Sequence, residues 1–201
     1  MAAADIPISA PFSSCSAGFC DAFDGKVART KKNRSQAERS FGVQIDSLSD
    51  LVAFGVLPAA IGNGMLRRSA LMSLVHGTRW QTVLEIGLTA LLILYILAAL
   101  IRLAYFNVTE EERQRTESGA RTHFTGLPVT STALIFPFVL LLQYVIPSDV
   151  TPVYFATAAI CAAAFLSPVQ VRKPGLRGVL IMVGIGAVEF LLMLIGKVLK
   201  C

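Results

Sequence analysis

Long apolar segments separated by shorter polar ones make up most of the 201-residue chain. Five apolar stretches approach the roughly 20 residues that a helix needs to cross a bilayer. They cover residues 43–66, 83–103, 127–146, 152–168 and 178–197, and the charged segment 104–126 between two of them suits a solvated, helical loop. The pattern predicts an all-α, polytopic membrane helix bundle that forms one domain over residues 1–201.

Composition agrees with a membrane protein and argues against an ordinary soluble domain. Charged residues make up 15% of the chain, whereas about 25% is typical of soluble domains. A net charge of +5 is compatible with binding to nucleic acid, with binding to anionic lipid, or with basic cytoplasmic loops. Because no basic face with interleaved aromatic residues is present, we expect membrane lipids and no nucleic acid among the partners.

Lysine and arginine are distributed unevenly between the two sides of the predicted bundle. The segments 25–42, 102–126 and 169–177 fall on one side and carry 13 of the 18 basic residues. Cytoplasmic loops of membrane proteins carry such an excess. The count therefore predicts that loop 25–42 faces the cytoplasm.

Two pairs of aspartates lie beside this loop, near the predicted cytoplasmic ends of apolar segments. Asp21 and Asp24 are three residues apart, and Asp46 and Asp50 are four apart. Each spacing places both carboxylates on one face of a helix. Ionisable groups at such positions are costly unless they are paired or functional, and oxygen ligands select hard divalent cations such as Mg²⁺, Mn²⁺ or Ca²⁺. The alternative is that the carboxylates only pair with the basic loop.

Residues 21–50 carry the pattern DxxDGxxAR followed by GxxxDxxxD, which resembles the signature of the CDP-alcohol phosphatidyltransferases. The resemblance implies a membrane enzyme in which an alcohol hydroxyl displaces CMP from a CDP-linked lipid, with Mg²⁺ or Mn²⁺, two ions, as the cofactor. It assigns metal binding to Asp21, Asp24, Asp46 and Asp50, with Asp50 also as a candidate general base. It assigns contacts with the cytidine nucleotide to Gly25, Ala28, Arg29 and Gly42. Twelve residues separate Arg29 from Gly42, more than is usual in the family, and this polar excess predicts a longer cytoplasmic loop.

Three further segments are similar to the phosphatidylserine synthase branch of that family. They are FGVQIDSLSDLVAFGVLPA (41–59), RLAYFNV (102–108) and FTGLPVTSTALIFP (124–137). The resemblance implies transfer of a phosphatidyl group from CDP-diacylglycerol to L-serine, by a homodimer in a bacterial cell membrane with its active site facing the cytoplasm. A sister enzyme that uses glycerol phosphate, inositol phosphate or another alcohol is the alternative; a transporter fits the glycine and arginine spacing less well.

Four residues outside the aspartate motif are candidates for binding the acceptor. Arg102 ends a long apolar run and could hold the serine carboxylate or a lipid phosphate; its alternative role is a snorkelling anchor with its charged end in water. Asn107, Thr125 and Gly126 are candidates for a substrate loop, with ordinary turn or capping roles as alternatives.

The start of the chain differs from the family pattern. Two membrane helices normally precede the aspartate motif in this family, but only 20 residues precede Asp21 here, including Pro7, Pro11 and several serines. The sequence therefore predicts that the first helix is absent and that residues 1–20 are irregular or form part of the second. An inactive, truncated membrane paralogue is the corresponding alternative function.

Overall fold

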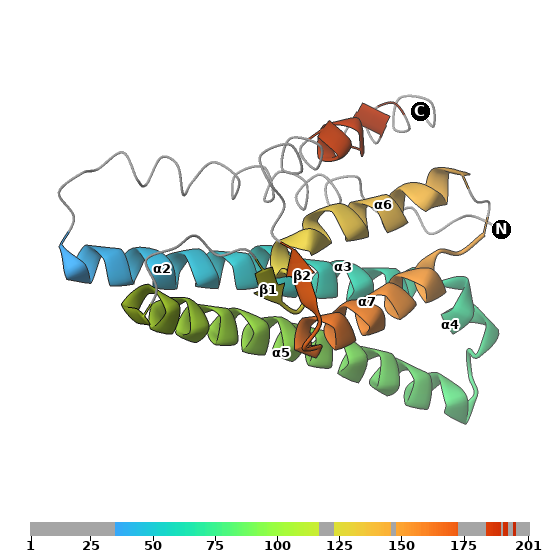
Figure 1. Ribbon diagram of the computed structural model, residues 1–201. Helices are drawn as coiled ribbons and strands as arrows, with labels where there is room; N and C mark the ends of the chain where they lie inside the picture. The colour runs from blue at the N-terminus through green and yellow to red at the C-terminus, as the bar shows by residue number, and fades with distance from the viewer. Residues whose placement is uncertain are drawn as a thin grey trace.

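The computed structural model describes residues 35–116, 123–145, 148–172, 184–189, 191–192 and 195. The chain is a helical bundle in which α2, η1 and α3 follow one another as a single rod and α5 runs back alongside it (Figure 1). The elements are α2 (Gln36–Asp50), the π-helix η1 (Leu51–Val56), α3 (Leu57–Arg68), α4 (Ala70–Leu74), α5 (Arg79–Thr116), β1 (His123–Thr125), the 3-10 helix η2 (Val129–Ser131), α6 (Thr132–Val145), α7 (Thr151–Leu166) and β2 (Gln170–Arg172).

The helix that carries Asp46 and Asp50 begins earlier than the apolar pattern indicated. Ser35 caps α2: its side chain accepts a hydrogen bond from the Glu38 N–H at 3.2 Å, while the Glu38 carboxylate accepts one from the Ser35 N–H at 2.9 Å. This reciprocal arrangement satisfies two backbone donors at a helix start. The prediction that residues 25–42 form a loop is therefore wrong for its last part, because the chain is helical from Gln36.

A π-helical turn joins α2 to α3, and its cause is local. Pro58 has no N–H, so the Phe54 carbonyl four residues earlier cannot accept the regular α-helical hydrogen bond. The hydroxyl of Tyr95 on α5 donates to this carbonyl instead, and the Thr132 hydroxyl lies 3.4 Å from it. The widened turn is thus stabilised by side chains of two other helices.

The core lies where α5, α6 and α7 meet η1 and α3, and aromatic side chains lie at its centre. Ring centroids lie 5.6 Å apart for Tyr95 and Phe136, 4.8 Å for Phe136 and Tyr154, and 5.8 Å for Tyr95 and Phe165. The first pair is edge-on, an arrangement that contributes beyond its buried area, and the other two are tilted. The core therefore fixes the three helices against one another close to the π-helical turn.

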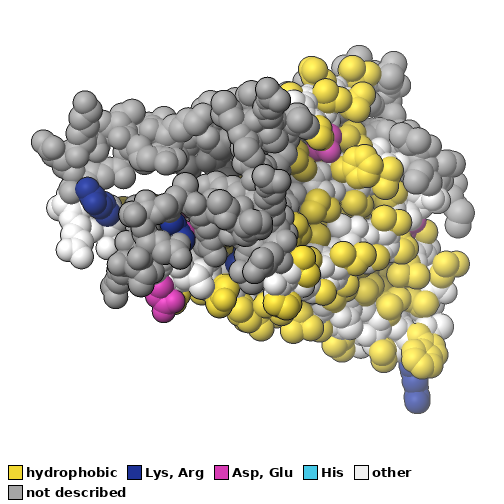
Figure 2. All heavy atoms as spheres, in the orientation of Figure 1, with side chains coloured by type: hydrophobic (Ala, Val, Ile, Leu, Met, Phe, Trp, Pro, Cys, Tyr) yellow, Lys and Arg dark blue, Asp and Glu magenta, His cyan; other side chains and the backbone are white. Residues whose placement is uncertain are grey.

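Hydrophobic side chains also cover much of the outside of the bundle. Figure 2 shows them gathered over the part of the molecule that contains α5, α6 and α7. Leaving such a side chain in water costs about 1.5–3 kcal/mol relative to burying it. The exposed residues on α5 include Ile86, Ile93, Leu94, Leu97, Leu100 and Ile101. This surface suits a lipid environment.

Two mainly helical stretches, Gln36–Leu74 and Arg79–Arg113, are long and apolar enough to cross a membrane, and Val129–Gln143 and Thr151–Leu166 are shorter apolar helices. The predicted spans 43–66, 83–103, 127–146 and 152–168 fall largely on these helices. Of the span predicted at 178–197, the structure describes only 184–189, 191–192 and 195, all helical. The charged segment after residue 103 continues α5 as helix to Thr116.

Beside the helices, the described residues form one short antiparallel β-ladder. β1 pairs with β2 in the register His123 with Arg172 and Thr125 with Gln170. The ladder joins the segment that precedes α6 to the segment that follows α7. It therefore ties together the start of α6 and the end of α7, beside the middle part of α5 (Figure 1).

Candidate functional site

The second aspartate pair of the motif lies on α2, one helical turn apart. Asp46 is exposed and Asp50 is half-buried, where α2 passes into the π-helical turn. Gly42 lies one further turn towards the helix start, and no described residue lies within 4 Å of a Cβ added there. The three residues therefore follow one side of α2. The remaining motif residues, Asp21, Asp24, Gly25, Ala28 and Arg29, lie outside the described residues.

Asn107 on α5 contacts α2 between the two aspartates. Its side-chain Nδ2 donates to the Ser47 hydroxyl at 2.7 Å. Ser47 follows Asp46 directly, so this bond joins the aspartate-bearing helix to a residue 60 positions later in the chain. The sequence predicted Asn107 as a candidate for substrate binding. It did not predict the bond to Ser47, because nothing in the local pattern links two segments so far apart.

Arg102 lies inside the bundle and binds backbone. Only 4% of it is exposed. Its Nε donates to the Leu127 carbonyl at 3.1 Å, and one terminal nitrogen donates to the Gly126 carbonyl at 3.3 Å. A snorkelling anchor would place its charged end in water, so that alternative is wrong. The arginine instead ties α5 to the turn that precedes α6.

Gly126 forms this turn and needs to be glycine. Its φ is +80°, a conformation that side chains with a Cβ adopt at a cost. An added Cβ would lie 3.0 Å from both the Phe165 and Ser167 carbonyl oxygens, and the Gly126 N–H donates to the Val169 carbonyl at 2.6 Å. Gly126 thus has a structural role in a turn. The sequence had left this role open as the alternative to substrate binding. Thr125 lies beside it in β1, opposite Gln170.

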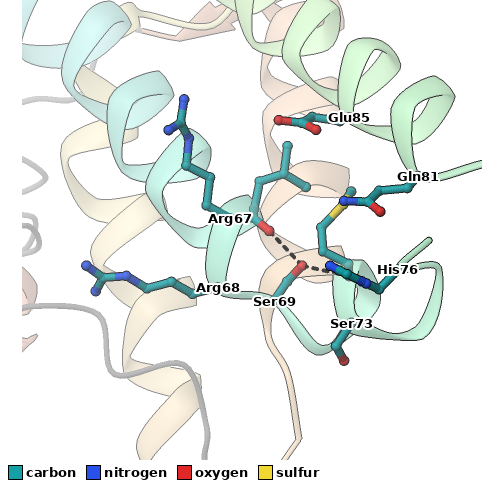
Figure 3. Close-up of a pocket in the computed structure, with 9 residues that line it drawn as sticks. Arg67, Arg68, Ser69, Ser73, His76, Gln81 and Glu85 are labelled. Carbon is teal, nitrogen blue, oxygen red and sulfur yellow. Dashed lines mark hydrogen bonds between the residues drawn. The ribbon is translucent and has the colours of Figure 1, made fainter.

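A hollow of about 440 Å³ lies at the other end of the rod, between α3, α4 and α5. From Asp50 to Arg68 the rod is roughly 27 Å long at 1.5 Å per residue. Figure 3 shows Arg67 and Arg68 extending to one side, with His76, Gln81 and Glu85 on the other side of Ser69. This hollow therefore belongs to a different end of the bundle from the aspartates.

Within the described ranges, no three His, Cys, Asp or Glu side chains gather as a metal-binding group. Asp46 and Asp50 supply two carboxylates on one helical face, which is the donor type that Mg²⁺ and Mn²⁺ prefer. Asp46 and Asp50 are two of the four carboxylate ligands that the motif implies.

The fold and motif are those of a membrane phosphatidyltransferase, and a family model agrees. The model for CDP-alcohol phosphatidyltransferase matches residues 8–169, which include both aspartate pairs. The chain belongs to this family.

Curated relatives give a more specific comparison. The chain is 38% identical over 117 residues to a Saccharomyces cerevisiae protein, covering 57% of this chain and 35% of that protein. It is 30% identical over 123 residues to a Helicobacter pylori protein, covering 61% and 42% respectively. It is 32% identical over 118 residues to a Mycobacterium leprae protein, covering 59% and 33%. All three are named CDP-diacylglycerol–serine O-phosphatidyltransferase. The matched region is thus less than half the length of each relative.

Proposed function

We propose that the chain transfers a phosphatidyl group from CDP-diacylglycerol to the hydroxyl of L-serine, giving phosphatidylserine and CMP. The observation that carries the proposal is the aspartate motif of residues 21–50 in a family member whose similar relatives bear that enzyme's name. In this reaction the serine oxygen forms a bond to the phosphorus that bears the diacylglycerol. The bond from that phosphorus to the CMP oxygen breaks, and CMP leaves with the electron pair.

The residues of the motif have distinct roles in this proposal. Asp21, Asp24, Asp46 and Asp50 would hold two Mg²⁺ or Mn²⁺ ions, which neutralise charge on the diphosphate when they are bound. Asp50 is also the candidate to accept the proton of the serine hydroxyl. Its half-buried position at the end of α2 supports this role, since a carboxylate there is partly withdrawn from water. Gly25, Ala28, Arg29 and Gly42 would contact the cytidine nucleotide.

The proposed acceptor site includes Thr125, with Gly126 shaping the turn beside it. Asn107, the other candidate from the sequence, bonds to Ser47 on the aspartate-bearing helix. Arg102 supports this region from within the bundle through its bonds to the Gly126 and Leu127 carbonyls. The proposal further places the site at the cytoplasmic face of the membrane, on the basis of the lysine and arginine count. That this is a bacterial cell membrane is proposed from the family resemblance. A homodimer is proposed from the family resemblance.

The acceptor is tested by the release of CMP from CDP-diacylglycerol by the full chain in detergent, with Mn²⁺ or Mg²⁺ present. We expect L-serine to release CMP well above the rate with water, and chelation of the metal to abolish the release. Glycerol phosphate and inositol phosphate are the comparison alcohols. If one of them releases CMP and serine does not, the acceptor assignment is wrong. Metal-dependent binding of CDP-diacylglycerol without turnover would instead indicate an inactive paralogue.

A further inference from the structure

The helix that carries Asp46 and Asp50 is weakly held by packing. None of the residues of α2 is buried. Side-chain tips lie about 5–6 Å from a helix axis, so a 20° rotation of α2 would move a carboxylate by roughly 2 Å. Displacements of about 1 Å can reduce the rate of an enzyme around 100-fold. Correct orientation of the two aspartates therefore requires a specific contact that sets the rotation of α2.

The hydrogen bond from Asn107 to Ser47 is well placed to be that contact. It joins α2 to α5 at 2.7 Å, within the turn that separates Asp46 from Asp50. Both partners are half-buried, so water competes less for the bond than at an exposed position. α5 is itself fixed by the aromatic core through Tyr95, which makes it a firm support for α2.

We propose that Asn107 is a positioning residue that orients the aspartate face of α2 through Ser47. The inference rests on the proposed function, because the aspartates need orientation only if they bind metal. It gives Asn107 a role different from contact with the acceptor. A residue that contacts serine would act on its own, whereas a positioning residue acts through its partner.

A double-mutant cycle in the full chain distinguishes the two roles. The variants are Asn107→Ala, Ser47→Ala and the two combined, with Ser47→Thr retaining the hydroxyl. Each alanine variant should bind Mn²⁺ about tenfold more weakly, measured by electron paramagnetic resonance in detergent without substrate. Each should also lower kcat for CMP release by about tenfold or more, with the serine KM within twofold of wild type. The double variant should be no worse than either single one, and Ser47→Thr should approach wild type.

The matched control is Thr109→Ala, on the same helix, where the hydroxyl bonds to the Tyr105 and Phe106 carbonyls within α5. We expect it to leave Mn²⁺ binding and kcat unchanged. A higher serine KM in Asn107→Ala, with Ser47→Ala normal, would overturn the proposal in favour of direct substrate contact. Additive effects, or Mn²⁺ binding unaffected in both single variants, would also overturn it. Because Mn²⁺ binding needs no acceptor, failure of wild type to use serine leaves this test intact and refutes only the acceptor assignment.

Discussion

Replacing Tyr95 with phenylalanine tests the explanation of the π-helical turn that follows Asp50. The Tyr95 hydroxyl is buried and donates to the Phe54 carbonyl. That carbonyl lacks its regular helical donor because Pro58 has no N–H. Tyr154 offers a matched comparison, since its hydroxyl donates to the Pro58 carbonyl at 2.7 Å, and the residue four positions after Pro58, Gly62, does have an N–H.

The two phenylalanine variants should therefore differ in stability although each loses one hydroxyl. Removing Tyr154's hydroxyl should cost about 0.6 kcal/mol, the average for a side-chain hydrogen bond within a membrane protein. Removing Tyr95's hydroxyl leaves a buried carbonyl poorly satisfied, which costs about 1–3 kcal/mol; the Thr132 hydroxyl at 3.4 Å offsets part of this. We expect a net loss of about 1–2 kcal/mol for Tyr95→Phe.

The assay is reversible unfolding of the purified chain in mixed micelles, titrated with a denaturing detergent. A Pro58→Ala background supplies an N–H at that position, so the cost of Tyr95→Phe should fall there towards that of Tyr154→Phe. Equal costs for the two phenylalanine variants in the wild-type background would refute the reasoning. So would a cost of Tyr95→Phe that is unchanged by Pro58→Ala.

Three other substitutions give separate tests. Asp50→Asn should abolish CMP release while the protein level stays near that of wild type; retained activity would remove Asp50 from the mechanism. Gly126→Ala should destabilise the chain by about 2 kcal/mol or more, because its positive φ alone costs roughly 1–2 kcal/mol for a residue with a Cβ and that Cβ would crowd two carbonyl oxygens. The control is Gly64→Ala in α3, where no described residue lies within 4 Å of an added Cβ. It should instead stabilise the chain by up to about 1 kcal/mol, and equal effects of the two substitutions in detergent unfolding would contradict the turn assignment. Arg102→Lys should lower stability by about 1.5–3 kcal/mol through its lost bonds to backbone with the serine KM unchanged; a raised serine KM at normal stability would make Arg102 a substrate contact instead.

The local sequence pattern was sufficient to predict the class of the protein. Long apolar runs predict membrane helices because a bilayer leaves backbone groups no partners outside the helix. The aspartate motif was readable because its spacing reflects one helical face, and the structure places Asp46 and Asp50 one turn apart as expected. The true start of α2 was also present in the sequence, as Ser35 followed three residues later by Glu38, but the basic charges around it made a loop the simpler interpretation.

The tertiary structure decided which distant residues support the site. The sequence around Arg102 does not show whether its side chain reaches water, substrate or backbone. Its bonds to the carbonyls of Gly126 and Leu127 are seen only in the folded chain. Pro58 predicts a missing helical hydrogen bond, but not that Tyr95 supplies a replacement. Nor does the pattern around Ser47 indicate Asn107, 60 residues away. Such pairings depend on how whole helices pack in space, and sequence spacing carries that information only within a few turns of one helix.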